Sequence, residues 1–200
     1  EDCTNKCAAA SGNELFTMTG DGIVVFDIAT GDTIRTLDIE SSAFSICNDG
    51  TRIAAAVWGE GSYVPTLFDI QTGEPVSTLN YTSSEMFSPA NIVTNDKQDI
   101  FVAEIGWTGT VGVWDMKSGE EVTQFKTGDY PPLTLRVSPD GKQIATTGHD
   151  NVLKLWNAKS GKLEQEFKHF EPGTEDDPNV WYMFVADAAY SPDGKMIAIP

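Results

Sequence analysis

The chain has 200 residues, 40% hydrophobic and 22% charged, which is enough to bury a core and excludes a disordered polymer. Thirty acidic residues against 13 Lys and Arg give a formal net charge of −17, which repels phosphate backbones and excludes nucleic acid as an expected partner. No apolar run approaches the roughly 18–20 residues that span a bilayer, so membrane insertion is not expected.

Residues 1–11 are expected to form an N-terminal segment ahead of the folded domain. Cys3 and Cys7 lie in it and are candidates for a disulfide bond if the protein is exported, and pairing of either one with Cys47 is an alternative. The chain begins at Glu1 without an initiator methionine. This start, the cysteine pair and the acid excess lean towards an extracellular or periplasmic location, with a cytoplasmic scaffold as the alternative.

From residue 12 onward, one sequence element occurs four times without a gap. The copies read VFDIATGDTIRTL, LFDIQTGEPVSTL, VWDMKSGEEVTQF and LWNAKSGKLEQEF. Their glycines are 42, 46 and 42 residues apart and stand at Gly31, Gly73, Gly119 and Gly161. A second element (NDG, NDK, SPDG and SPDG) alternates with the first, in copies at 48–50, 95–97, 138–141 and 191–194. Two elements that alternate at a fixed phase indicate a repeat protein.

Each repeat is expected to contain four short β-strands. The segments between turns are rich in Val, Ile, Leu, Thr and aromatic residues and are five to seven residues long. Asp-Gly and Ser-Gly steps supply the positive φ that tight hairpin turns need. No window of about 11 residues shows a helical period. The best example has strands at 133–138, 142–148, 151–157 and 162–167. The sequence therefore predicts an all-β protein.

Antiparallel four-stranded units with this period are typical of the blades of a β-propeller. Four blades are expected over residues 12–200, closing near 37, 79, 125 and 167, with the start of a fifth at 184–200. Because propellers hold roughly four to eight whole blades, the chain is expected to be the N-terminal part of a larger propeller.

The stretch SPDGKQIATTGHDNVLKLWNAKSGK, at 138–162, resembles the WD40-repeat family, whose repeat closes with Trp-Asp. The resemblance extends over the chain from about residue 12. The closing pair is Trp-Asp in one copy, at Trp114-Asp115. In the other three copies one of the two residues is replaced, and the pairs are Phe26-Asp27, Phe68-Asp69 and Trp156-Asn157. Near the places where a WD40 repeat usually opens with Gly-His, this chain has Thr127-Gly128-Asp129 and Lys168-His169-Phe170 instead. Divergent YVTN-like and quinoprotein-type propellers are alternatives.

The resemblance implies a hydrogen-bond network within each blade, of which Asp150 and Thr146 would keep a part with Trp156. The aromatic-Asp pairs themselves are interpreted as structural, because the same residue in every blade is spread around a ring, whereas catalysis needs unlike groups that converge. The aromatic ring is expected to pack between blades and the Asp or Asn to accept backbone N–H bonds in the next turn. No catalytic residue and no cofactor is predicted.

Length variation is confined to the loops after the second and fourth strands, which share one face of a propeller. A binding surface is expected there because these loops carry aromatic residues of the kind enriched at interfaces. The candidate partner-binding residues are Trp58, Tyr63, Trp107, Tyr130, Phe170 and Trp181.

These observations favour a non-catalytic scaffold that binds a protein or peptide, in an oligomeric state that the sequence does not indicate. The alternative is a secreted or periplasmic enzyme domain of quinoprotein or hydrolase type, with an active site that depends on further blades. Carboxylates that Ca²⁺ would accept stand at Glu175, Asp176 and Asp177, but they match no ordered calcium loop, and a solvated acidic loop is the favoured interpretation.

Overall fold

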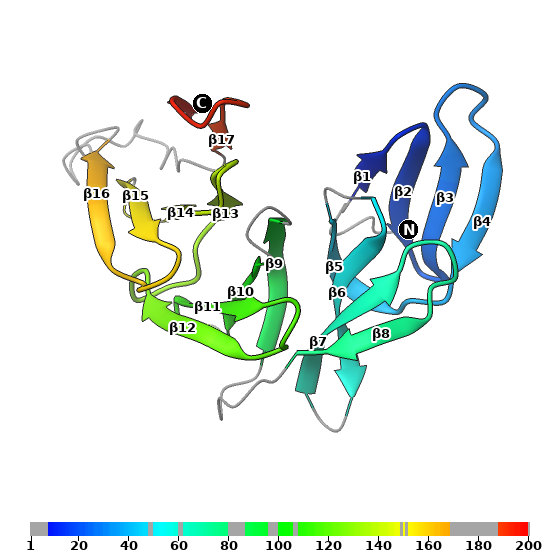
Figure 1. The fold of residues 1–200 in the computed structure, drawn as a ribbon, viewed down its shortest axis with the longest axis horizontal. Helices are drawn as coiled ribbons and strands as arrows, with labels where there is room; N and C mark the ends of the chain where they lie inside the picture. Colours follow the sequence, from blue (N-terminus) through cyan, green and yellow to red (C-terminus); the bar gives the residue numbers. More distant parts are fainter. Residues whose placement is uncertain are drawn as a thin grey trace, which may run out of the picture.

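The computed structural model describes residues 8–47, 50–59, 62–79, 87–95, 100–105, 108–148, 150, 152–168 and 188–199. All regular structure in these residues is β: four four-stranded sheets and one two-stranded sheet follow one another along the chain. The sheets stand side by side in an open arc (Figure 1). The prediction of an all-β fold built from four-stranded propeller blades is confirmed.

The blades are numbered in chain order. Blade 1 contains β1 (Ala8–Ser11), β2 (Glu14–Thr19), β3 (Gly22–Asp27) and β4 (Thr33–Leu37). Blade 2 contains β5 (Ser41–Ile46), β6 (Arg52–Gly59), β7 (Ser62–Asp69) and β8 (Pro75–Thr78). Blade 3 contains β9 (Phe87–Asn95), β10 (Ile100–Ile105), β11 (Thr110–Asp115) and β12 (Glu121–Lys126). Blade 4 contains β13 (Thr134–Val137), β14 (Gln143–Thr147), β15 (Val152–Asn157) and β16 (Leu163–Lys168). The two-stranded sheet consists of β17 (Ala189–Tyr190) and β18 (Ile197–Ala198).

Every blade is an antiparallel meander in which the strands pair in chain order. The first strands of the blades form the inner row, in which β5 contacts β9 and β9 contacts β13. Blade 1 begins earlier than the boundary expected at residue 12. The reason is pairing: Ala8 lies opposite Thr17 and Ser11 opposite Glu14, so Ala8–Ser11 is the inner strand of that blade.

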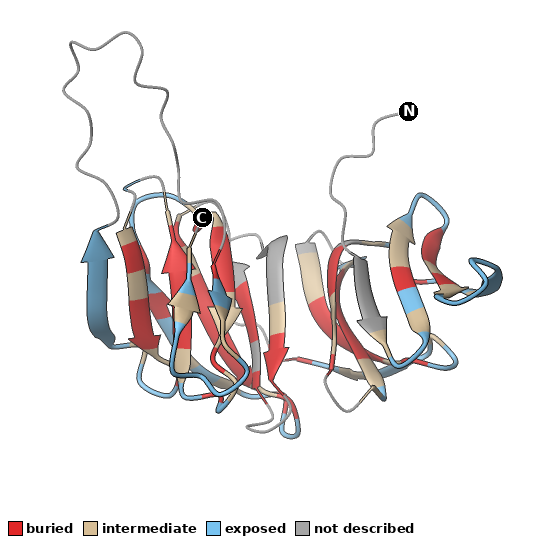
Figure 2. Ribbon diagram, turned by 90° about the horizontal axis from the view of Figure 1, so that it is seen from above, coloured by how far each residue is buried: buried red, intermediate tan, exposed pale blue. Residues whose placement is uncertain are grey.

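The hydrophobic core lies in the seams between blades. One cluster joins blades 1 and 2 and includes Phe16 and Ile53. The next cluster joins blades 2 and 3 and includes Leu67 and Cys47, whose side chain is buried at 1% exposure. A third cluster joins blades 3 and 4. Figure 2 shows buried residues on the facing strands and an exposed outer strand β16. Each blade is therefore stabilised mainly by its immediate neighbours, as in other repeat folds.

In blades 2 to 4 the aromatic residue of the closing pair packs against the preceding blade. Trp114 lies in the cluster shared with blade 2, Phe68 in the cluster shared with blade 1, and Trp156 in the cluster shared with blade 3, where its ring lies 4.9 Å from that of Phe125. Phe26 is only half-buried, and among the described residues no blade precedes its own.

The residue after the aromatic organises the turn to the outer strand. The Asp27 carboxylate accepts hydrogen bonds from the backbone N–H groups of Ala29 and Thr30, at 2.8 and 2.9 Å. The N–H of Gly31 donates to the Asp27 carbonyl, and Gly31 has a φ of 78°, which a side chain would strain. The same bonds recur after Asp69, Asp115 and Asn157.

Candidate functional site

The two faces of the arc differ in their connections. Because strands alternate in direction within a meander, the organised turns after the third strands lie on one face, and the connections after the second and fourth strands lie on the other (Figure 2). We call the second face the loop face. In the described chain it includes the connections 38–40 and 127–133 and the strand ends that carry Trp58 and Tyr63.

A pocket of about 530 Å³ lies at the seam of blades 1 and 2. We call it the first seam pocket. Asp38 and Glu40 of the β4–β5 connection line it, and Trp58 lies at the end of β6. Strands β7 and β8 complete the lining with Thr66, Phe68, Pro75 and Thr78. The pocket thus combines carboxylates, threonine side chains and the aromatic and apolar side chains of Trp58, Phe68 and Pro75.

Trp58 is 61% exposed although it is among the largest hydrophobic side chains of the protein. Its ring meets that of Tyr63 edge to face, with centroids 5.1 Å apart and an interplanar angle of 80°. Tyr63 in turn packs against the core cluster of blades 2 and 3. Two of the residues expected to bind a partner are therefore neighbours, with one anchored in the core and the other projecting into solvent.

A second pocket, of about 460 Å³, lies at the seam of blades 3 and 4. We call it the second seam pocket. Tyr130, another expected binding residue, lines it from the β12–β13 connection and is 69% exposed. The Lys154 ammonium group donates to the Asp150 carboxylate at 2.6 Å and to the Thr127 carbonyl at 3.0 Å. The Thr147 hydroxyl is buried in the lining without a hydrogen-bond partner.

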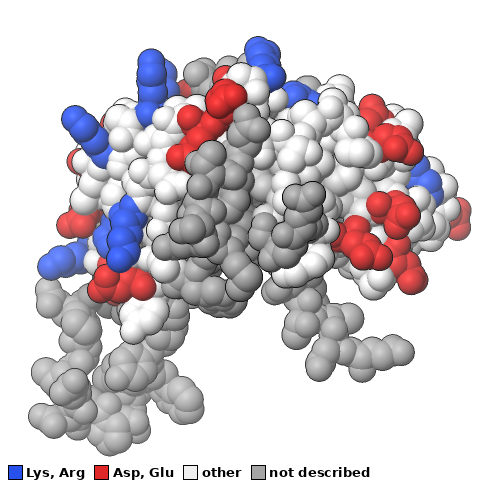
Figure 3. Space-filling model, turned by 90° about the horizontal axis from the view of Figure 1, so that it is seen from below, with Lys and Arg blue, Asp and Glu red and all other residues white. Residues whose placement is uncertain are grey.

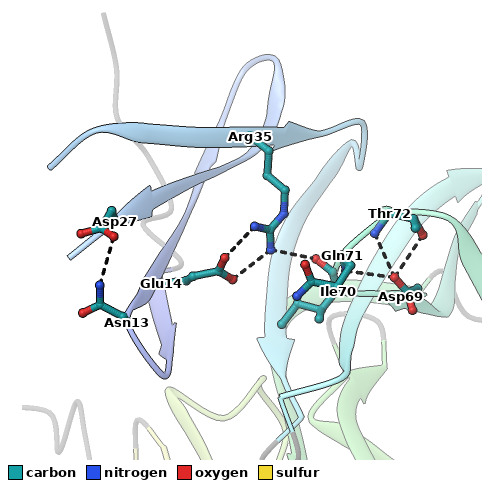
Figure 4. Close-up of polar contacts among 8 residues, drawn as sticks. All are labelled: Asn13, Glu14, Asp27, Arg35, Asp69, Ile70, Gln71 and Thr72. Carbon is teal, nitrogen blue, oxygen red and sulfur yellow. Dashed lines mark hydrogen bonds and ion pairs between the residues drawn. The ribbon is translucent and has the colours of Figure 1, made fainter. Parts of the chain in front are cut away.

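Away from the pockets, Arg35 joins blades 1 and 2 (Figure 4). Its guanidinium group donates to both oxygens of Glu14, at 2.6 and 2.9 Å, and to the Ile70 carbonyl in blade 2 at 3.2 Å. The hydrogen bond from Arg35 is the main cause that lowers the pKa of the Glu14 carboxyl. Sequence reasoning missed this contact, because nothing in the spacing of residues 14, 35 and 70 marks them as partners.

Several expected site residues lie outside the described part of the chain: Trp107, Phe170, Trp181, Cys3, Cys7, Glu175, Asp176 and Asp177. Within the described part, no three His, Cys, Asp or Glu side chains form a group that could hold a metal ion. No helix in that part is long and apolar enough to cross a membrane.

Comparison with protein families assigns the repeat. The WD40 model, described as a WD domain or G-beta repeat, matches residues 119–157, which run from the turn of blade 3 to the end of β15. The match identifies a WD40 repeat at residues 119–157. In each of the four four-stranded sheets the strands pair in chain order, and the aromatic residue of the closing pair is the penultimate residue of the third strand.

Among known proteins, the chain is 25% identical over 124 residues to the periodic tryptophan protein 2 homolog of Schizosaccharomyces pombe, covering 62% of this chain and 14% of that protein. It is 27% identical over 159 residues to autophagy-related protein 16 of Arabidopsis thaliana, covering 78% and 31%. It is 26% identical over 110 residues to protein groucho of Drosophila melanogaster, covering 55% and 15%. The matched region therefore spans less than a third of the length of each of these relatives.

Blade 4 retains part of the WD40 hydrogen-bond network. The Trp156 indole N–H donates to the Thr146 hydroxyl at 2.8 Å, and both side chains are buried. Asp150 contributes differently, because its carboxylate accepts from Lys154 and from the Val152 backbone N–H at 3.2 Å. Lys154 is a polar residue of the site that the sequence reasoning did not single out.

Proposed function

We propose that this WD40 protein is an interaction scaffold that binds a protein or peptide partner through its loop face. The similarity to WD40 proteins supports the scaffold role in general. The observation that carries the proposal is the pair of exposed aromatic residues, Trp58 and Tyr130, each at a pocket on the same face. Tyr and Trp at such positions supply most of the binding free energy in many interfaces.

The experiment compares partner capture by three forms of the full-length protein immobilised on a resin: the wild type, Trp58→Ala/Tyr130→Ala, and a control. The control is Ile28→Ala/Val76→Ala, because Ile28 and Val76 are exposed hydrophobic residues in the organised turn of blade 1 and on the outer strand of blade 2. Captured proteins are identified by mass spectrometry, and their contact points by chemical cross-linking.

We expect a partner whose recovery falls at least about tenfold with Trp58→Ala/Tyr130→Ala and stays unchanged in the control, with thermal unfolding alike in all three forms. A partner that cross-links to the turn face, or recovery that is equal for wild type and loop-face variant, would contradict the proposal.

A further inference from the structure

The two seam pockets occupy equivalent places in the repeat. Thr66 of blade 2 and Lys154 of blade 4 each stand two residues before the closing aromatic, and each pairs with the second strand of its blade, opposite Ala55 and Thr146. Both residues line their pocket, together with the connection that enters the blade from the preceding outer strand. The pockets can therefore be compared position by position.

In the second seam pocket the chain provides its own cation. The Lys154 ammonium group lies between a carboxylate of its own blade and a carbonyl of the entering connection, and its side chain is only 15% exposed. This arrangement shows that a seam of this propeller accommodates an ammonium group next to oxygen ligands.

In the first seam pocket the equivalent position carries no cation. Thr66 donates its hydroxyl hydrogen to the Val64 carbonyl, and no Lys or Arg is present in the described lining. The entering connection instead carries two exposed carboxylates, Asp38 and Glu40, and no described Lys or Arg pairs with either. The first seam pocket thus has two carboxylates on its entering connection, at positions other than those of the oxygens that bind Lys154, and its described lining has no positive charge.

The surroundings favour a cation as well. Residues 8–79 contain ten Asp and Glu and only two Arg, and one of these is held by Glu14. Figure 3 shows acidic side chains with little Lys or Arg among them over the side of blades 1 and 2, whereas over blades 3 and 4 acidic side chains are accompanied by most of the Lys and Arg in this view. Trp58 adds an exposed indole, the aromatic ring that attracts cations best.

We propose that the first seam pocket receives a Lys or Arg side chain of the partner, held by the carboxylates of Asp38 and Glu40 and by the ring of Trp58. This inference rests on the proposed function, because it names the chemistry of the partner at one point of the loop face. A partner with a basic segment complements the charge of blades 1 and 2, and Lys154 of blade 4 is its internal counterpart.

The test uses the full-length protein and short peptides of sequence acetyl-Gly-Ser-Gly-X-Gly-Ser-Gly-amide, in which X is Arg, Lys, Gln or Leu. The readout is the indole N–H resonance of Trp58, assigned by its loss in Trp58→Phe. We expect the Arg and Lys peptides to shift this resonance and to saturate it with dissociation constants on the order of millimolar, whereas the Gln and Leu peptides leave it in place.

Charge variants test the residues. Asp38→Asn/Glu40→Gln is expected to weaken binding of the Arg peptide at least about fivefold. The matched control Asp32→Asn/Glu166→Gln removes two exposed carboxylates, one from the turn of blade 1 and one from the outer strand β16, and should keep the affinity within about twofold, because neither residue nor its chain neighbours line the pocket. Thr66→Lys, which copies the internal cation of blade 4, should abolish peptide binding.

Equal shifts with the Gln peptide, or an unchanged affinity in Asp38→Asn/Glu40→Gln, would overturn the inference. These results do not depend on partner capture. If capture requires Trp58 and Tyr130 while the basic peptides do not bind, the proposed scaffold role is supported and the proposed binding of a Lys or Arg side chain in the first seam pocket is wrong. If the peptides bind as expected while Trp58→Ala/Tyr130→Ala leaves partner capture unchanged, the first seam pocket binds cations and the proposal that the loop face binds the partner is wrong.

Discussion

At the scale of single residues, the fold depends on one side-chain oxygen at the end of each third strand. The pKa values of Asp27, Asp69 and Asp115 are lowered, chiefly because each carboxylate accepts a backbone hydrogen bond from the third residue after it. Asn157 makes the same backbone contacts without a charge, at 3.1 and 3.0 Å. The geometry of the oxygen therefore matters more than its charge, which explains why the Asp of the WD40 pair is replaceable by Asn.

Asp115→Ala is expected to lower the free energy of unfolding by about 1 kcal/mol, because the N–H groups of Lys117 and Ser118 lose their acceptor. Asp115→Asn should cost less than about half of this, as Asn157 indicates. Urea denaturation of both variants measures the difference. Equal destabilisation by Ala and Asn would show that the charge, not the acceptor geometry, holds the turn.

At the scale of elements, neighbouring blades are joined by a few polar contacts in addition to the apolar seams. Arg35 on β4 reaches the carbonyl of Ile70 in blade 2 while Glu14 on β2 fixes its guanidinium group in a two-bond fork. The side chains of Arg35 and Glu14 are 20% and 27% exposed, so solvent screens this pair less than the pairs at the surface.

Arg35→Met keeps an apolar side chain of similar length and removes the two hydrogen bonds to the Glu14 carboxylate. It is expected to lower the free energy of unfolding by about 1–2 kcal/mol. Arg35→Lys should restore less than half of the loss, because an ammonium group cannot bind both carboxylate oxygens in the same plane. The control is Lys142→Met, which removes a pair with side chains 74% and 58% exposed and should change stability by less than about 0.5 kcal/mol. A loss in Lys142→Met as large as in Arg35→Met would contradict this ranking.

Gly109 positions the connection that carries Tyr130. It has a φ of +73°, and a Cβ there would come closer than 3.0 Å to the carbonyl oxygens of Gly128 and Tyr130. Gly109→Ala should therefore cost about 2–3 kcal/mol and displace Tyr130. Gly31→Ala, with a φ of +78° and open space around the Cβ, should cost only about 1 kcal/mol. Thermal unfolding ranks the two variants, and an equal loss in both would remove the steric argument.

At the scale of the whole molecule, the repeat was readable from the sequence because each blade repeats the same local chemistry. The turn at Gly31 and its equivalents depend on contacts within a few residues along the chain. The aromatic residue at Trp114 depends on packing between neighbouring blades, which recurs in the repeat. The seam pockets were not predictable, because they depend on which side chains meet across blades. Lys154 and Asp38 illustrate this: each is an ordinary surface residue in the sequence, and only the blade packing places it in a pocket lining.

The lowered carboxyl pKa values in every blade predict acid sensitivity. A group whose pKa is lower in the folded state stabilises the fold fully above its unfolded pKa, and this contribution is lost as the pH falls through the folded pKa. The free energy of unfolding should therefore drop as the pH falls below about 4. In Asp27→Asn/Asp69→Asn/Asp115→Asn this drop should be shallower than in the wild type. Urea titrations at a series of pH values measure it, and parallel curves would assign the acid sensitivity to other groups.

The buried thiol of Cys47 gives the molecule an internal reporter. It lies at 1% exposure in the cluster shared by blades 2 and 3, beside Leu67 and Trp114. An alkylating reagent reaches this sulfur only when the two blades part, so in a form with Cys3→Ser and Cys7→Ser the rate of labelling measures the opening equilibrium of a single seam. Slower labelling in the presence of a captured partner would mean that binding at the rim tightens contacts deep between the blades.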